Sequence, residues 1–147
     1  MSKNIFEALR KDHESQRTLI NMLTDTSGDT KGREKIFKRL KNEVTAHAAA
    51  EERYFYRPLM EHDNTMDKSR HSVAEHKEIE DIIEELEKTD MSSAGWLVTA
   101  KKLEERLIHH LDEEEQEVFK SAGHALKEKE KQDFGEHFIE EKERLLD

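Results

Sequence analysis

One arrangement of histidines and glutamates occurs twice in this chain, at a constant offset. Six residues make up the two copies: His13, His47, Glu51, His76, His110 and Glu114. Adding 63 to the first three numbers gives the last three. In each half, a histidine is followed 34 positions later by a second histidine, and a glutamate comes four positions after that. The repeat predicts a helical hairpin that is used twice, with a pseudo-twofold axis through these residues.

Apolar residues at helical spacing surround this repeat. One proline and five glycines leave long stretches without breakers, which favours helices over strands. Pro58 is expected to end or kink the second helix near Tyr56 or Arg57. The expected helices span residues of about 3–24, 30–60 and 68–88, a fourth from a cap at Asp90 or Ser92 to about 121, and a shorter fifth over about 127–146.

The connections between the long helices are short, and short connections favour antiparallel neighbours. The predicted fold class is therefore all-α, an antiparallel up-down-up-down four-helix bundle with a short additional C-terminal helix. A length of 147 residues is that of one ordinary domain, so a single domain over residues 1–147 is expected. Charged residues make up 41% and hydrophobic residues 33%, as in many disordered chains, but the periodic placement of the apolar residues indicates folding.

Charge and composition exclude several classes of function. The formal charge is 25 − 35 = −10 with both signs intermixed, which disfavours nucleic acid as a partner. The absence of cysteine excludes disulfides, thiolate metal sites and iron–sulfur ligation. No stretch approaches the roughly 18 apolar residues of a membrane span, and the charged N-terminal sequence does not resemble a signal peptide. A cytoplasmic protein without a membrane partner is the expectation.

A lone histidine on an apolar stripe is usually a core residue with satisfied hydrogen bonds, and a lone His-x-x-x-Glu is often a solvated pair. His62, His124 and His137 are read in this way. The six repeated residues differ because each takes a position where its helical stripe needs an apolar residue. His47 and Glu51 share one helix face, as do His110 and Glu114. Helix lengths at about 1.5 Å per residue place all six near one level of a bundle.

Burial of six such groups without partners would remove most of the roughly 5–15 kcal/mol by which a domain is stable. A pair of metal ions would convert this cost into binding energy. Two carboxylates can bridge two ions, and two imidazoles can complete the protein ligands of each ion. Imidazole with carboxylate suits iron, manganese or zinc.

At these residues the chain resembles the hemerythrin-like HHE cation-binding domain family. The resemblance covers about residues 4–145 and rests on the segments Asp12-His13-Glu14, His47-Ala-Ala-Ala-Glu51-Glu52, Glu75-His76 and His109-His110-Leu-Asp-Glu-Glu114-Glu115, with Glu52-Arg-Tyr-Phe-Tyr-Arg-Pro58. It implies a di-iron centre with an oxo or hydroxo bridge inside a four-helix bundle. It also implies that the four histidines are terminal ligands and that Glu51 and Glu114 are bridging carboxylates.

One position departs from the oxygen-carrying members of this family. They have a fifth histidine one turn from the third-helix ligand, where this chain has Ser72 and Glu80 around His76. His71 lies about 140° off that face and is a poor substitute, and His109 is assigned to the surface or to a supporting role. The expected site is more symmetric, with open positions on both ions, which favours reactivity or sensing over oxygen carriage.

Three further residues are weaker candidates. Tyr54 lies three residues after Glu51 on nearly the same face, where it either contacts the centre or, as the more common case, is a boundary tyrosine. Arg17 and Glu80 are related by the offset of 63 and either pair across the pseudo-twofold axis or, as is usual for charged residues on helices, are solvated. Trp96 and Phe37 are expected in the core.

Two classes of function follow for these residues. The first is a di-iron protein that binds, senses or reacts with O2, NO or peroxide. The alternative is a metal-storage, metal-sensing or protein-interaction module without catalytic turnover. A metal-free structural bundle is the third reading, and it predicts that His47→Ala leaves the metal content unchanged.

Overall fold

The computed structural model describes residues 4–28 and 30–147, and every regular element in this part of the chain is helical. The all-α prediction is therefore confirmed. Turns of π-helix, labelled η, interrupt two of the long helical segments. In chain order the elements are α1 (Ile5–Thr24), α2 (Lys31–Glu51), η1 (Glu52–Tyr56), α3 (Arg57–Leu59), α4 (Asp63–Lys88), α5 (Ala94–Glu113), η2 (Glu114–Val118), α6 (Phe119–Ala125) and α7 (Glu128–Leu146).

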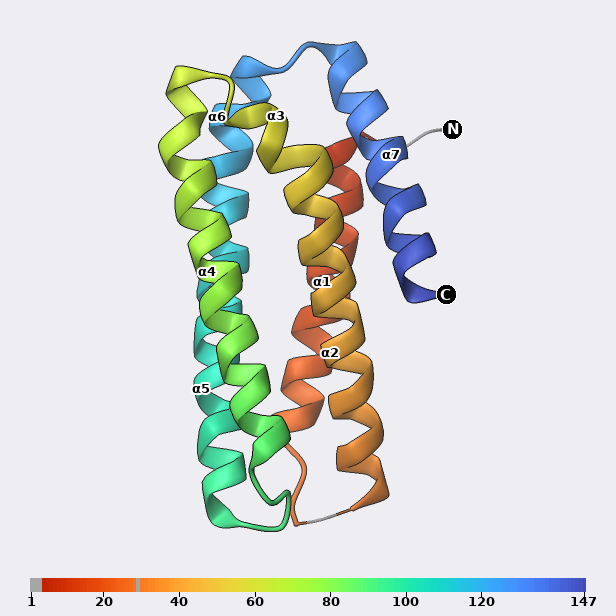
Figure 1. Ribbon diagram of the computed structural model, residues 1–147, viewed down its shortest axis with the longest axis vertical. Helices are drawn as coiled ribbons and strands as arrows, with labels where there is room; N and C mark the ends of the chain where they lie inside the picture. The colour runs from red at the N-terminus through yellow and green to blue at the C-terminus, as the bar shows by residue number, and fades with distance from the viewer. Residues whose placement is uncertain (1–3, 29) are drawn as a thin grey trace.

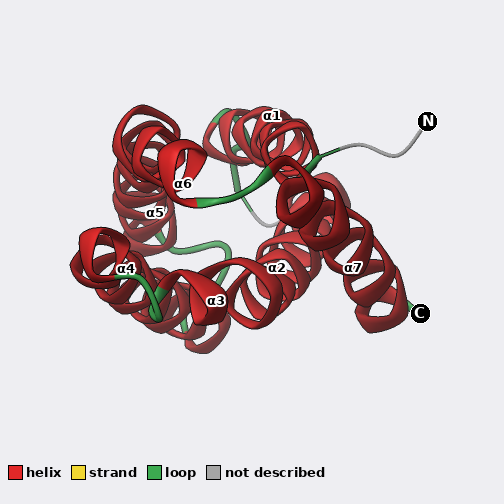
Figure 2. Ribbon diagram, turned by 90° about the horizontal axis from the view of Figure 1, so that it is seen from above, coloured by secondary structure: helices red, strands yellow, loops and turns green. Residues whose placement is uncertain are grey.

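Four long helical segments lie side by side along the long axis of the molecule (Figure 1). They are α1, the run from α2 through α3, α4, and the run from α5 through α6. Seen from above, these segments surround a common centre, with α7 packed outside α1 and α2 (Figure 2). Contacts join α1 to α2, α4 to α5, α1 to α5 and α2 to α4, so each segment faces the same interior.

Two of the long helices begin at residues whose side chains satisfy a free backbone N–H. The Asn4 Oδ1 atom accepts a hydrogen bond from the Glu7 amide at 2.9 Å, and the Thr30 Oγ1 atom accepts one from the Arg33 amide at 3.1 Å. Such caps stabilise a helix by about 1 kcal/mol each. The caps therefore determine the residues at which α1 and α2 begin.

The apolar core has two parts, one on each side of a polar band. One cluster includes Ile20 and Leu23 of α1, together with Leu40 and Trp96. The second cluster, toward the other end, includes Ile5, Leu9, Phe55, Phe119 and Phe138. The band between them contains the buried histidines and glutamates, so apolar side chains close the site from above and below.

Several helix limits differ from the sequence predictions. Helical conformation persists through Pro58: the chain enters a π-turn after Glu51 and resumes as α3, with Pro58 in the first turn of α3. α4 begins at Asp63, five residues before the expected start, and α6 continues to Ala125, beyond the expected end near residue 121. Residue 3, the predicted start of the first helix, lies outside the described residues.

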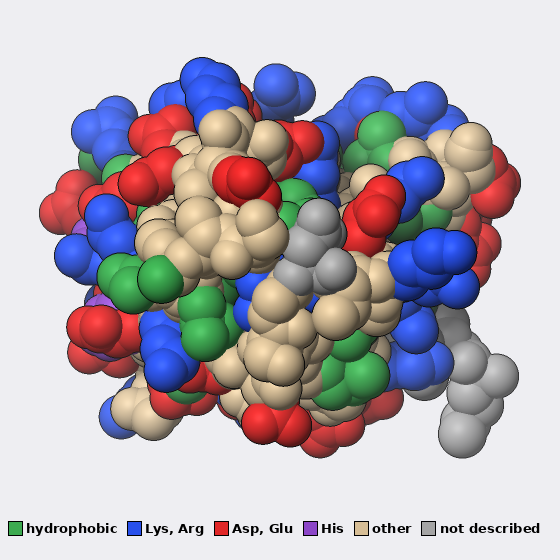
Figure 3. Space-filling view, turned by 90° about the horizontal axis from the view of Figure 1, so that it is seen from below, with side chains coloured by type: hydrophobic (Ala, Val, Ile, Leu, Met, Phe, Trp, Pro, Cys, Tyr) green, Lys and Arg blue, Asp and Glu red, His purple; other side chains and the backbone are tan. Residues whose placement is uncertain are grey.

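The C-terminal helix is not short, because α7 has 19 residues and α1 has 20. It buries Phe138 against the second apolar cluster. Among the described residues, no helix is long and apolar enough to cross a membrane. The end of the molecule seen in Figure 3 carries acidic and basic side chains interspersed with small hydrophobic areas, consistent with the mixed charge of the sequence.

Candidate metal centre

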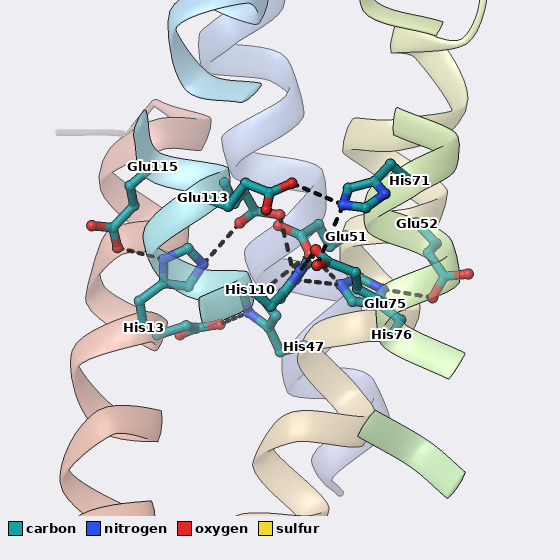
Figure 4. Close-up of polar contacts among 12 residues, drawn as sticks. His13, His47, Glu51, Glu52, His71, Glu75, His76, His110, Glu113 and Glu115 are labelled. Carbon is teal, nitrogen blue, oxygen red and sulfur yellow. Dashed lines mark hydrogen bonds and ion pairs between the residues drawn. The ribbon is translucent and has the colours of Figure 1, made fainter. Parts of the chain in front are cut away.

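The six repeated residues come together between the two apolar clusters. α1 contributes His13, α4 contributes His76, and the two His-x-x-x-Glu pairs come from α2 and from the junction of α5 with η2. The three most enclosed side chains, His13, Glu51 and Glu114, are completely buried, and none of the six is more than 8% exposed. Figure 4 shows His13, His47, His76 and His110 coming from separate helices, with His47 and His76 close to Glu51.

The six residues form two overlapping groups, each able to hold one metal ion. Within each group, one nitrogen or oxygen atom per residue lies within 4.8 Å of the others. His13 and His47 belong to one group and His76 and His110 to the other. Both groups include the two glutamates, Glu51 and Glu114, which is the arrangement that bridging carboxylates require. The described residues therefore contain a buried His/Glu cluster that can hold metal.

Each of the four histidines bonds a carboxylate through its Nδ1 atom. The Nδ1–acceptor distances are 2.6 Å from His13 to Glu115, 2.8 Å from His47 to Asp12, 3.0 Å from His76 to Glu52 and 2.8 Å from His110 to Glu75. An Nδ1–H that donates outward leaves the lone pair of the neutral ring on Nε2, which points to the centre of the cluster. The four rings are thus held in the orientation and tautomer that a metal site needs.

These supporting carboxylates follow the same repeat as the residues they hold. Adding 63 to Asp12 gives Glu75, and adding 63 to Glu52 gives Glu115. Each of the four acids adjoins one of the six repeated residues in the sequence, but no role was predicted for them. The offset itself carried the signal, because a duplicated site repeats its supporting residues together with its central ones.

Two of the four supporting carboxylates, Glu115 and Asp12, also contact a basic side chain. Arg17 contacts Asp112 at 2.9 Å and Glu115 at 3.1 Å, and Lys142 of α7 contacts Asp12 at 2.8 Å. The candidate pair between Arg17 and Glu80 does not form, because Arg17 contacts carboxylates of α5 and η2 while Glu80 is exposed on α4. Arg17 therefore supports His13 through Glu115 and does not reach across the pseudo-twofold axis.

A π-turn adjoins each buried glutamate: η1 follows Glu51, and η2 begins at Glu114. A π-turn adds one residue to a helical turn, so the residue five positions after the glutamate takes its face. Tyr56 is accordingly buried, with its ring centroid 5.8 Å from that of His76 and its hydroxyl without a hydrogen-bond partner. Tyr54, which regular spacing placed toward the centre, instead packs on His137 at 5.4 Å.

The two buried glutamates have opposite pKa shifts. Burial and the neighbouring Glu51 carboxylate raise the pKa of Glu114 well above its usual value. Burial also works against ionised Glu51, but the positive charges of His47 and His76 outweigh it and leave the pKa of Glu51 well below its usual value. For His47, burial is outweighed by Glu51 and Asp12, which raise the pKa to about 9. The protein without metal thus keeps protons in this cluster.

The unsatisfied polar atoms in the cluster fit a metal pair. Both carboxylate oxygens of Glu51 and of Glu114 are buried without a hydrogen-bond partner, as are the Nε2 atoms of His13 and His47. The Nε2 atoms of His76 and His110 face each other at 3.1 Å. Some of these atoms are close without being well oriented for hydrogen bonding, such as His13 Nε2 and Glu114 Oε1 at 2.9 Å. Buried nitrogen and oxygen atoms that converge with so few hydrogen-bond partners are the donor set of a cation.

A small internal cavity of about 20 Å³ borders the cluster, and His47, His76 and His110 are among its lining residues. Gln16 also lines it, is 2% exposed, and has a side-chain amide nitrogen without a hydrogen-bond partner. A cavity of this size admits a water molecule or a diatomic. A larger groove of about 800 Å³ opens between α2 and α4 and shares Val44, Ala48 and His76 with it.

The remaining histidines lie outside the cluster. His71 and His109 are exposed on α4 and α5, in agreement with their sequence assignment, and His124 and His137 are exposed. His62 is half-buried immediately before α4. Ser72 is buried and Glu80 is exposed, so among the described residues no fifth histidine stands one turn from His76 on α4.

Fold and site together define an all-helical, cation-binding protein with a buried His/Glu cluster. The sequence model of the hemerythrin HHE cation binding domain matches residues 4–122. The chain belongs to this family.

The structure is similar to the crystal structure of a hemerythrin HHE cation binding domain-containing protein from Mycobacterium kansasii. The TM-score is 0.87 at 21% identity, and the similarity covers 98% of this chain and 88% of the other. At this level of identity, the likeness concerns the fold. No curated protein matches the sequence.

Proposed function

We propose that residues 1–147 form a single domain, an antiparallel up-down-up-down bundle built around a carboxylate-bridged two-metal centre. In this proposal His13 and His47 bind one ion and His76 and His110 the other. Glu51 and Glu114 bridge the two ions. The observation that carries the proposal is the set of buried, unpartnered nitrogen and oxygen atoms on these side chains.

We infer that the resident metal is a pair of iron ions with an oxo or hydroxo bridge. The donor set is nitrogen and oxygen only, which suits iron and also admits manganese or zinc. When bound, the iron pair would supply redox chemistry and coordination positions for a small ligand. The carboxylate on each histidine would raise its basicity toward the metal.

We propose that the domain binds, senses or transforms a small ligand, which is O2, NO or peroxide. The cavity beside the histidines has a volume of about 20 Å³, which suits a molecule of this size. The unpartnered amide nitrogen of Gln16 can donate a hydrogen bond to a molecule in this space. The groove that shares His76 with the cavity supplies a route from solvent.

Optical spectroscopy of iron-loaded protein without an affinity tag tests this function. Anaerobic reduction followed by O2 or NO should change the near-ultraviolet and visible charge-transfer bands. Glu51→Gln should lose metal. An iron-loaded sample without such bands, or one that O2, NO and peroxide leave unchanged, contradicts the proposal, and bound metal without turnover favours the storage or sensing alternative.

Gln16→Leu examines the ligand cavity separately. Loss of one hydrogen bond should weaken NO binding by up to about tenfold while the metal content stays at the wild-type level, because Gln16 is not among the residues that hold metal. Gln132→Leu, at an exposed position of α7, is the control and should bind NO as the wild type does. Equal NO affinity in Gln16→Leu and wild type would remove Gln16 from the site.

A further inference from the structure

A second cluster of imidazoles and carboxylates lies on the outer side of α4 and α5. His71 Nε2 lies 2.9 Å from Glu113 and 3.4 Å from Glu75. His109 Nε2 lies 2.9 Å from Glu113 and 3.9 Å from Glu75. The buried centre does not use His71, His109 or Glu113, and Figure 4 shows His71 directed toward Glu113 and Glu75.

The cluster is built like a chelating site. His71 and Glu75 are four residues apart on α4, and His109 and Glu113 are four apart on α5, so each pair shares one helix face. Donor atoms of His71, Glu75 and Glu113 all lie within 4.8 Å of one another. Both histidine side chains are more than half exposed, whereas those of Glu75 and Glu113 are 13% and 23% exposed. An ion can therefore reach the site, and its carboxylates are held in place.

Comparison of the two halves shows what the cluster replaces. Subtracting 63 from His71, Glu75, His109 and Glu113 gives Ala8, Asp12, Ala46 and Ala50. The three alanines are buried, and α7 packs against the helices that carry them. Only Asp12 keeps its carboxylate, and the Lys142 ammonium of α7 contacts that carboxylate at 2.8 Å.

Asp12 and Glu75 are equivalent in the two halves, and each has one oxygen directed away from the buried centre. This outer oxygen contacts an ammonium in Asp12 and two imidazoles in Glu75. Asp12 bonds His47 through one oxygen and Lys142 through the other. Glu75 bonds His110 through Oε1 and turns Oε2 to His71 and His109. Among the described residues, no lysine or arginine pairs with Glu75, so a metal cation for its outer oxygen would come from solvent.

We propose that His71, Glu75 and Glu113, with His109 as a fourth donor, bind one divalent transition-metal ion at the surface. Two imidazoles with two carboxylates suit zinc, cobalt, nickel or copper. The ion takes the place that the Lys142 ammonium has in the first half, and it contacts His110 of the buried centre through Glu75. This site exists independently of what fills the buried centre.

Cobalt(II) titration of the protein without an affinity tag tests the site. Equilibrium dialysis should show that His71→Ala/His109→Ala binds one equivalent fewer than the wild type. Because the readout is a difference of one equivalent, it does not depend on the occupancy of the buried centre. His124→Ala/His137→Ala, which removes two exposed histidines elsewhere, is the matched control and should bind as the wild type does.

A second variant separates this site from the buried one. His47→Ala should lose buried metal but keep the cobalt equivalent that His71→Ala/His109→Ala removes. Equal cobalt stoichiometry in the wild type and His71→Ala/His109→Ala would overturn the surface site. Circular dichroism should give the same helix content for both, since these histidines are exposed.

Discussion

Asp12 shows how the buried histidines are held. Its carboxylate accepts a hydrogen bond from His47 and another from Lys142, so the imidazole, the acid and the ammonium form a chain from the centre to α7. Such a chain fixes the ring and raises its basicity toward a metal. Glu115 and Arg17 repeat the arrangement for His13.

Asp12→Asn should weaken metal binding by about 10–100-fold, because an amide supports the imidazole less well than a carboxylate does. Competition with a coloured chelator measures the affinity. Glu43→Gln is a matched control, since Glu43 also contacts Lys142 at 2.8 Å and is the partner of none of the four buried histidines. Equal losses in the two variants would mean that Lys142, and not the contact with His47, sets the affinity.

At the scale of elements, the two π-turns and α7 shape the surroundings of the buried His/Glu cluster. Each π-turn begins at or directly after a buried glutamate. α7 contributes Phe138, whose ring lies 5.4 Å from that of His47. The helix therefore completes the apolar enclosure on the side of α1 and α2.

Phe138→Ala should lower the free energy of unfolding by about 3–5 kcal/mol, because it empties a buried aromatic position. Urea denaturation followed by circular dichroism measures the change. Phe134→Ala removes a half-buried ring of the same helix and should cost less. If the two variants lose the same stability, α7 is not anchored through Phe138.

For the whole molecule, metal binding is coupled to protons. The folded pKa of His47, about 9 without metal, exceeds the ordinary value of 6.5. Protonated His47 therefore stabilises the metal-free fold fully below pH 6.5, and this contribution is lost as the pH rises through about 9. In the proposed site, a metal ion can bind Nε2 of His47 only after the proton has left this nitrogen.

Between pH 6.5 and about 9, metal uptake should therefore release protons, and the affinity should increase with pH. Calorimetric titration in two buffers of different ionisation enthalpy measures the number released. An observed enthalpy that is the same in both buffers would show that no proton leaves.

Much of the frame was predictable from local pattern. Apolar spacing and the scarcity of breakers predicted the helices, and the offset of 63 singled out the residues that meet between the apolar clusters. Tyr54 is a half-buried boundary residue packed on His137, as the favoured reading of the sequence had it, whereas the burial of Tyr56 was not predicted. Tyr54 turns away and Tyr56 turns inward, because a π-turn shifts the register by one residue.

The sequence alone determined an all-α chain with a duplicated set of histidines and carboxylates, because periodicity and repetition are properties of the order of residues along the chain. Only the tertiary structure decided which acid supports which histidine, since Asp12 meets His47 and Glu115 meets His13 across different helices. It also decided that α7 covers one half and leaves His71 and His109 open on the other. Contacts of this kind depend on how helices pack, which no spacing within one helix specifies.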